Sequence, residues 1–179
     1  MQIAVVCCSL NPDSRSATLA EALRAPLADA GAEVDWIDLR DHDLPLCDGT
    51  TVYGRPEVRA MSKRLADADA VILATPIYNY DANAAAKNLV ELTGKAAWLN
   101  KTVGFVCSAG SPVSYMSLMP LAASLMLDFR CLVVPRFVYA DDRHFTADGL
   151  DPVITQRLDE LAHQTARLAA ALSATVPAD

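Results

Sequence analysis

The strongest constraint on the fold of this chain is a regular alternation of short apolar runs with longer segments of helical character. The apolar runs are rich in β-branched residues and cover residues 3–8, 33–39, 70–75, 102–107 and 131–138. The second run alternates with polar residues, which is typical of an outer strand, whereas most of the others are nearly continuous. Nearly continuous apolar runs are typical of strands in a parallel sheet that is covered on both faces.

The segments between these runs are predicted to be helices, over residues 15–30, 56–67, 82–98, 113–127 and 152–173. Strands that alternate with helices form parallel sheets with right-handed crossovers. We therefore expect an α/β fold, a flavodoxin-like three-layer α/β/α sandwich with a five-stranded parallel sheet in the order 2-1-3-4-5. Pro135 in the last run favours an edge strand, because proline cannot donate to a strand ladder.

The composition favours one globular domain over residues 1–179, with 53% hydrophobic and 21% charged residues. The net charge of −7 and the scattered basic residues disfavour nucleic acid and anionic membranes as partners. No apolar run approaches the roughly 18 residues that span a bilayer. Five cysteines without a CxxC motif favour buried free thiols, and we expect the protein in the cytoplasm.

The loop after the first strand, SLNPDSRS from Ser9 to Ser16, is predicted to hold a phosphate. In a sheet of this order, ligands bind beyond the carboxyl ends of the strands, where the strand order reverses. Serine hydroxyls and the Arg15 guanidinium can donate to an anion in front of a helix N-terminus. The loop lacks the motifs of a dinucleotide fingerprint and of an ATP P-loop. The alternative is that Asp13 or Ser14 only caps the helix and Arg15 points to solvent.

Two further loops are expected at the same edge of the sheet. After the third strand, which Pro76 is expected to end, two tyrosines flank Asn79 before a helix begins near Asp81. Tyrosines can pack on a flat heteroaromatic ring, although tyrosines that cover the core are the plainer interpretation. The loop after the fourth strand, residues 107–116, is rich in small residues that let a ligand approach the backbone. Each loop is a weak signal alone, and their order along the chain is more specific.

With these motifs, the chain resembles the flavodoxin-like NAD(P)H-dependent FMN reductases, in particular the branch of the alkanesulfonate-system FMN reductases. The resemblance spans residues 2–142 and is carried by short motifs. These are Ser9 with Ser14, Arg15 and Ser16, then Pro76 with Tyr78 and Asn79, then AAAKNLVEL with Lys87 and Asn88, then AGSPVSYMSL, and finally FVYADD at residues 137–142. Two positions depart from the family, because Cys8 stands where Gly is frequent and Asn11 where many members have Arg.

The resemblance implies that the phosphate belongs to FMN, and it implies three sets of cofactor-binding residues. The phosphate set is Ser9, Asn11, Ser14, Arg15 and Ser16. The set along the isoalloxazine ring is Pro76, Ile77, Tyr78, Asn79 and Tyr80. The set that closes the other side of the ring is Ser108, Ala109, Gly110 and Ser111.

The implied activity is hydride transfer from NADPH or NADH to flavin N5, followed by reduction of a small acceptor such as free flavin or a quinone. The flavin performs this chemistry, so no catalytic side chain is expected. His42, His144 and His163 have no metal-ligand spacing, so no metal is expected either. The alternative is a flavodoxin-type electron carrier without a substrate site of its own, whose acidity would suit docking to a redox partner. The resemblance leaves FMN open as a held group or as a released substrate.

Residues 113–127 are apolar on nearly every face of the predicted helix, whereas a helix that covers a sheet should keep a polar stripe. The resembled family forms dimers and tetramers. We therefore expect a homodimer or homotetramer with this helix as a candidate interface. The alternative is a core helix that ends at Asp128 and Arg130.

Overall fold

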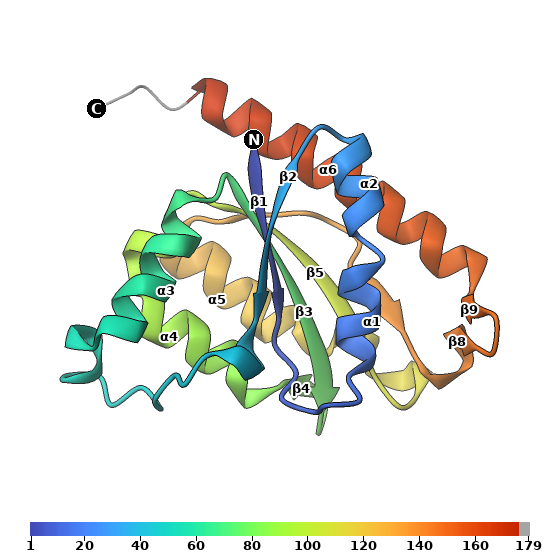
Figure 1. Ribbon diagram of the computed structural model, residues 1–179, viewed down its shortest axis with the longest axis horizontal. Coiled ribbons are helices and arrows are strands. Elements are labelled where there is room, and N and C mark those ends of the chain that lie inside the picture. The colour runs from blue at the N-terminus through green and yellow to red at the C-terminus, as the bar shows by residue number, and fades with distance from the viewer. Residues whose placement is uncertain (176–179) are drawn as a thin grey trace.

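The computed structural model describes residues 1–175 and consists of a mostly parallel sheet between two layers of helices (Figure 1). The strand order is β2-β1-β3-β5-β6, with β7 also paired to β5. The strands are β1 Gln2–Cys7, β2 Glu33–Asp38, β3 Ala70–Tyr78, β5 Thr102–Ser108, β6 Leu132–Val133 and β7 Val138–Ala140. Because β6 and β7 run parallel to β5 along the same edge, they share the fifth position, and the predicted flavodoxin-like order is confirmed.

The helices divide between the two faces of the sheet (Figure 1). One face carries α1 Arg15–Glu21, α2 Arg24–Asp29 and α6 Pro152–Thr175, and the other carries α3 Pro56–Asp67, α4 Ala84–Trp98 and α5 Met119–Phe129. Short 3-10 helices complete the connections: η1 Leu39–Asp41, η2 Val52–Gly54, η3 Pro112–Leu118 and η4 Asp142–His144. Two small antiparallel pairs join β4 Asp81–Ala82 to β3, and β8 Phe145–Thr146 to β9 Gly149–Leu150.

The core lies on both faces of the sheet, as the continuous apolar runs predict. In β1, Ile3 and Val5 pack with the α1, α2 and α6 layer, whereas Ala4 and Val6 pack with the α3, α4 and α5 layer. Helix α6 packs close to the sheet at Gly104, where a Cβ atom would lie 3.3 Å from atoms of Leu161 and Thr165.

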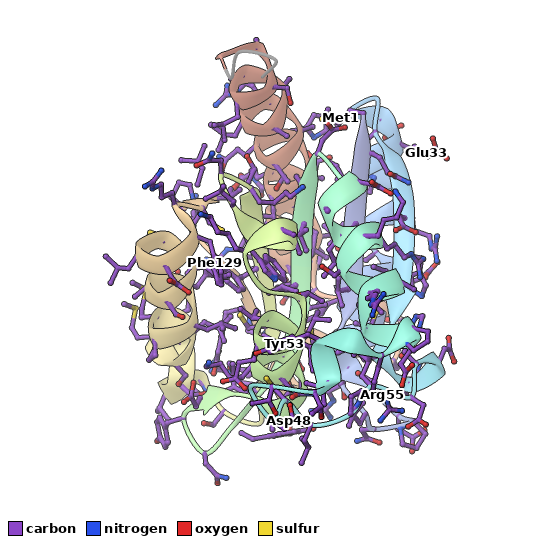
Figure 2. The ribbon with its side chains drawn as sticks, turned by 90° about the vertical axis from the view of Figure 1, so that its left-hand side faces the viewer. Met1, Glu33, Asp48, Tyr53, Arg55 and Phe129 are labelled. Atoms are coloured by element: carbon purple, nitrogen blue, oxygen red, sulfur yellow. The ribbon has the colours of Figure 1, made fainter. Side chains whose placement is uncertain are left out.

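The two ends of the sheet are distinguishable along the strand direction. In Figure 2, Met1 and Glu33 lie together at the end where β1 and β2 begin. Asp48, Tyr53 and Arg55 lie at the opposite end, toward which the strands run.

The predicted helix over residues 15–30 is wrong in one respect, because it is two helices separated by a turn at residues 22–23. Pro26 has no N–H for the Ala22 carbonyl, and its ring would clash with that carbonyl in a continuous helix. The Leu23 N–H instead donates to the Ala20 carbonyl at 3.0 Å.

The predicted helix over residues 113–127 begins as 3-10 helix η3, and the α-helix α5 starts at Met119 and continues to Phe129. Pro120 accounts for this boundary, because proline is tolerated in the first turn of a helix and not in its interior. The strand predicted over residues 131–138 is likewise interrupted between β6 and β7. Pro135 cannot donate there, and Arg136 has a φ of 66°.

Pro76 does not end the third strand, contrary to expectation. It pairs in parallel register with Ser108, and β3 continues to Tyr78. Asn79 and Tyr80, with φ angles of 52° and 62°, then form a tight turn into β4, which is the geometry of a two-residue hairpin. As a result, α4 begins at Ala84 and not near Asp81.

Four of the five cysteines are buried, whereas Cys47 is half-buried, and all five are free thiols. Burial raises the pKa of the Cys8 and Cys107 thiols and, with the nearby Asp38 carboxylate, raises that of Cys7 to about 12. High pKa values disfavour the reactive thiolate form. The buried thiols therefore pack as small apolar side chains.

Candidate functional site

A cavity of about 400 Å³ lies at the carboxyl ends of β1, β3 and β5, and all three predicted loops line it. The lining includes eleven predicted site residues: Ser9, Asn11, Ser14, Arg15, Ser16, Pro76, Ile77, Tyr78, Ser108, Ala109 and Gly110. Asp13 and Asp142 also line it and were not predicted as site residues. Three predicted residues, Asn79, Tyr80 and Ser111, lie outside this lining. The role of the predicted residues as cofactor ligands stays a prediction.

The loop between β1 and α1 is ordered by its own side chains. The Ser9 hydroxyl accepts a hydrogen bond from the Asn11 N–H at 3.3 Å, and the Asn11 side chain accepts one from the Asp13 N–H at 3.0 Å. Ser14 caps α1, with its hydroxyl oxygen accepting from the Ala17 N–H at 3.1 Å. Ser14 is therefore a helix cap, and its hydroxyl proton remains available to donate.

Arg15 and Ser16, at the start of α1, each bond to a cavity residue from a different part of the chain. Ser16 is fully buried, and its hydroxyl forms a 2.7 Å hydrogen bond with the Ser108 hydroxyl at the end of β5. Arg15 does not simply point to solvent, because it forms an ion pair with Asp142 and its guanidinium lies 5.2 Å from the centre of the Phe145 ring.

Asn83 is a residue of this region that sequence analysis missed. It is buried, donates to the Cys8 carbonyl at 2.6 Å and accepts from the Thr75 hydroxyl at 2.8 Å. Its side chain therefore ties the carboxyl ends of β1 and β3 together at the point where the strand order reverses. The available signal was a polar residue just before an Ala-rich helix, which suggests no more than a cap.

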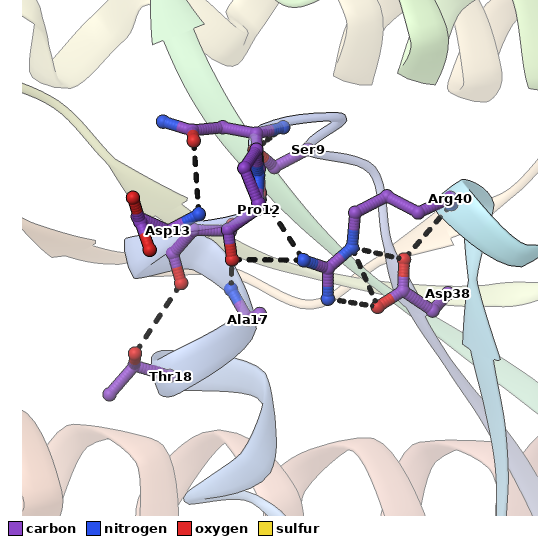
Figure 3. A network of polar contacts seen from close by, with 9 residues as sticks. Ser9, Pro12, Asp13, Ala17, Thr18, Asp38 and Arg40 are labelled. Carbon is purple, nitrogen blue, oxygen red and sulfur yellow. Dashed lines mark hydrogen bonds and ion pairs between the residues drawn. The ribbon is translucent and has the colours of Figure 1, made fainter.

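Arg40 holds the outer side of the loop after β1 (Figure 3). Its Nη1 donates to the Pro12 carbonyl at 3.0 Å and to the Asn11 carbonyl at 3.4 Å. Its Nε and Nη2 donate to the buried Asp38 carboxylate at 3.0 and 2.6 Å, and this contact lowers the pKa of Asp38. Arg40 lies outside the cavity lining, so it acts on the loop backbone and not on a ligand.

The turn after β7 positions Asp142 at the cavity. Asp141 is buried and caps this turn, accepting from the Arg143 N–H at 3.0 Å and from its Nη2 at 2.7 Å. The Arg143 guanidinium lowers the pKa of Asp141 to about 2. His144 Nδ1 accepts from the Asp141 N–H at 3.1 Å. Arg143 and His144, the two residues that follow Asp142, are thus both bonded to Asp141.

The donor set and the shape of the cavity fit FMN. Hydroxyls and one guanidinium at a helix start suit a phosphate monoester. The wall made by Pro76, Ile77 and Tyr78, with small residues of the loop after β5 in the same lining, suits a flat aromatic ring. A cavity of this volume lies within the usual range for small-molecule sites. Among residues 1–175, no three His, Cys, Asp or Glu side chains are grouped to hold a metal ion.

The sheet order and the cavity at its reversal point define a protein of the flavodoxin-like class. A sequence profile of the family described as NADPH-dependent FMN reductase matches residues 1–145, and the chain belongs to this family. The family uses NAD(P)H and FMN, as the resemblance of the sequence implied.

Two curated relatives agree with this assignment. The chain is 30% identical over 156 residues to an FMN reductase (NADPH) of Pseudomonas putida, covering 85% of this chain and 78% of that protein. It is 27% identical over 139 residues to an NAD(P)H-dependent FAD/FMN reductase of Geobacillus thermodenitrificans, covering 76% and 75%. The relatives are reductases, which favours the enzyme over the electron carrier.

A solved structure shares the fold. The apo form of an NADH:FMN oxidoreductase superposes with a TM-score of 0.78 at 19% identity, covering 93% of this chain and 89% of that one.

None of the helices in the described part of the chain has the length and apolar character needed to cross a bilayer.

The Arg40 contacts predict that Arg40→Ala weakens FMN binding about tenfold, because the loop carbonyls lose a charged donor and the loop loses its fixed conformation. Quenching of flavin fluorescence in an equilibrium titration measures this. Arg64→Ala is the matched control, since Arg64 forms a similar fork with Asp35 on the same strand, away from the cavity. Wild-type affinity in Arg40→Ala would contradict the role of Arg40.

The buried Asp141 predicts a pH-dependent stability. Its folded pKa lies below its unfolded value, so its contribution is present above about pH 4 and is lost as the pH falls toward 2. Arg143→Gln should therefore lower the midpoint of urea unfolding at pH 7, because the buried Asp141 carboxylate loses its charged donor. The deficit should shrink at pH 3, in urea unfolding at both pH values.

The control for that experiment is Arg136→Gln, because Arg136 is exposed and its contact with Glu160 spans 3.6 Å. This change should alter stability by well under about 1 kcal/mol at either pH. An Arg143→Gln deficit that stays constant between pH 7 and pH 3 would contradict the assignment to Asp141.

Proposed function

We propose that this protein is an FMN-dependent NAD(P)H oxidoreductase that transfers a hydride from NADPH or NADH to FMN and on to a small acceptor such as free flavin or a quinone. The observation that carries the proposal is the cavity at the carboxyl ends of β1, β3 and β5, whose hydroxyl and guanidinium donors lie beside an apolar wall. Membership of the FMN reductase family and the names of both curated relatives support the same activity.

The proposed roles follow the three loops. Ser9, Asn11, Ser14 and Arg15 bind the phosphate, and Ser16 supports them through its bond to Ser108. Pro76, Ile77 and Tyr78 lie along one side of the ring, with Asn79 and Tyr80 on the exposed hairpin beyond it. Ala109, Gly110 and Ser111 lie on the other side. FMN, when bound, supplies the hydride chemistry, and the chain binds it and orients its ring.

The activity test combines binding and turnover. The purified protein should bind FMN saturably and oxidise NADPH or NADH in its presence. Ser9→Ala should raise the FMN concentration for half-maximal rate about fivefold to tenfold, because a buried hydroxyl donor is lost. Ser62→Ala is the matched control, since its hydroxyl donates to the Thr93 carbonyl between α3 and α4. A protein that neither binds FMN nor oxidises NAD(P)H would refute the proposed function.

We also propose a homodimer or homotetramer that uses residues 113–127 as its interface. Several apolar side chains on η3 and α5 are exposed, including Leu127 at 85%, Val113 at 67% and Met116 at 60%. A hollow of about 290 Å³ between α5 and residues 133–137 is lined by Met119, Met126 and neighbouring side chains. Several exposed apolar side chains on one segment, some of them lining a hollow, favour a protein interface.

The interface proposal predicts that Met116→Lys combined with Leu127→Glu shifts the protein to a monomer in sedimentation velocity. Charged side chains at both positions would have to be buried in the interface without partners. Leu46→Glu is the control, because Leu46 is 80% exposed outside this surface. A wild-type protein that sediments as a monomer would refute the proposal.

Two broader proposals accompany the function. We propose that the chain forms a single domain over residues 1–179, which is supported by one main sheet that both helical layers share. We also propose that the protein acts in the cytoplasm, which is supported by its five free thiols.

A further inference from the structure

Arg15 and Asp142 meet at the cavity from positions 127 residues apart in the chain. Both side chains line the cavity and are about half exposed, at 47% and 53%. The Arg15 guanidinium also lies over the Phe145 ring, which limits the directions it can take. The guanidinium proposed to bind a phosphate is therefore already paired with a carboxylate of the same chain.

The charge around the proposed phosphate position is not favourable to an anion. The charged residues that line the cavity, among those described, are Asp13, Arg15 and Asp142, so the lining carries a net charge of −1. Arg143 does not offset Asp142, because its guanidinium is bonded to Asp141. A phosphate monoester adds about −1.5 to −2 at neutral pH. It must therefore compete with Asp142 for the Arg15 guanidinium.

Resting on the proposed function, we propose that Asp142 is a counter-ion of Arg15 that the FMN phosphate displaces, and that this competition keeps FMN exchangeable instead of permanently held. Asp142 is thus a residue that sets affinity for the phosphate and not for the ring. It acts through Arg15, because an ionised carboxylate cannot donate a hydrogen bond to an anion.

Asp142→Asn tests this role directly, because asparagine keeps the shape and a hydrogen-bond acceptor and removes the charge. FMN should bind about fivefold to tenfold more tightly, in keeping with the modest strength of half-exposed charge pairs. Riboflavin, which has the same ring and no phosphate, should bind wild type and variant equally. The gain for FMN should diminish at high salt, because salt screens exposed charges.

The experiment is a fluorescence-quenching titration of wild type and Asp142→Asn with FMN and with riboflavin at low and high salt. Asp148→Asn is the matched control, since Asp148 is exposed, lies outside the cavity lining and gives the same change in net charge. The same pair of variants is also built on Arg15→Gln. With Arg15 absent, Asp142→Asn should change FMN affinity by less than about twofold.

The outcomes separate this inference from the proposed function. Wild-type protein that binds FMN, together with Asp142→Asn that binds it no more tightly, would overturn the counter-ion role and leave the function standing. An equal gain for riboflavin, for Asp148→Asn or in the Arg15→Gln background would also overturn it. If wild type binds no FMN, the proposed function fails. In that case, thermal unfolding with inorganic phosphate still tests the competition, since Asp142→Asn must be stabilised by phosphate more than wild type.

Discussion

The rest of the structure depends on the burial of β1 between β2 and β3, with helices on both faces. Every residue of β1 after Gln2 is buried, so the strand cannot tolerate a polar group before it ends. The chain leaves β1 toward the layer of α1 and leaves β3 toward the layer of α4, on the opposite face (Figure 1). Connections that diverge in this way open a crevice between the two loops. Asn83 spans the base of that crevice through its bonds to Cys8 and Thr75, so the strand ends remain joined where the loops separate.

Much of the fold could be predicted from the sequence because the strands are buried on both faces and their apolar runs are nearly continuous. The errors fall at prolines. Pro26 and Pro120 lie within segments whose composition is typical of helix, and the pattern alone does not say whether a proline breaks a helix or begins one. Pro76 lies inside β3 in parallel register with Ser108, although a proline after an apolar run normally indicates its end. In each case the effect of the proline on the helix or strand depends on how the surrounding segments of the chain pack against it. Sequence periodicity does not describe that packing.

The loops of the site could be predicted because each follows directly from a strand end. The residues that complete the site could not, because each reaches it through tertiary contacts. Asp142 comes from the turn after β7, the short strand that pairs with the end of β5. Arg40 contacts a carbonyl 28 residues earlier in the chain, and Asn83 one 75 residues earlier. A single sequence gives no indication of such pairs.

The loop after β1 is thus held from two sides with opposite consequences for an anion. On its outer side, Arg40 takes the carbonyls of Asn11 and Pro12, so the loop backbone is ordered before any ligand arrives. Preorganisation of this kind lowers the cost of binding. On its inner side, Asp142 pairs with the Arg15 guanidinium that is proposed to bind the phosphate, and this raises the cost of phosphate binding. Both contacts join one guanidinium nitrogen to oxygen, and they differ in whether the arginine supports the loop or belongs to the site. Affinity for a phosphate is therefore adjusted by Arg40 and Asp142, which the phosphate does not need to touch, as well as by the residues that bind it.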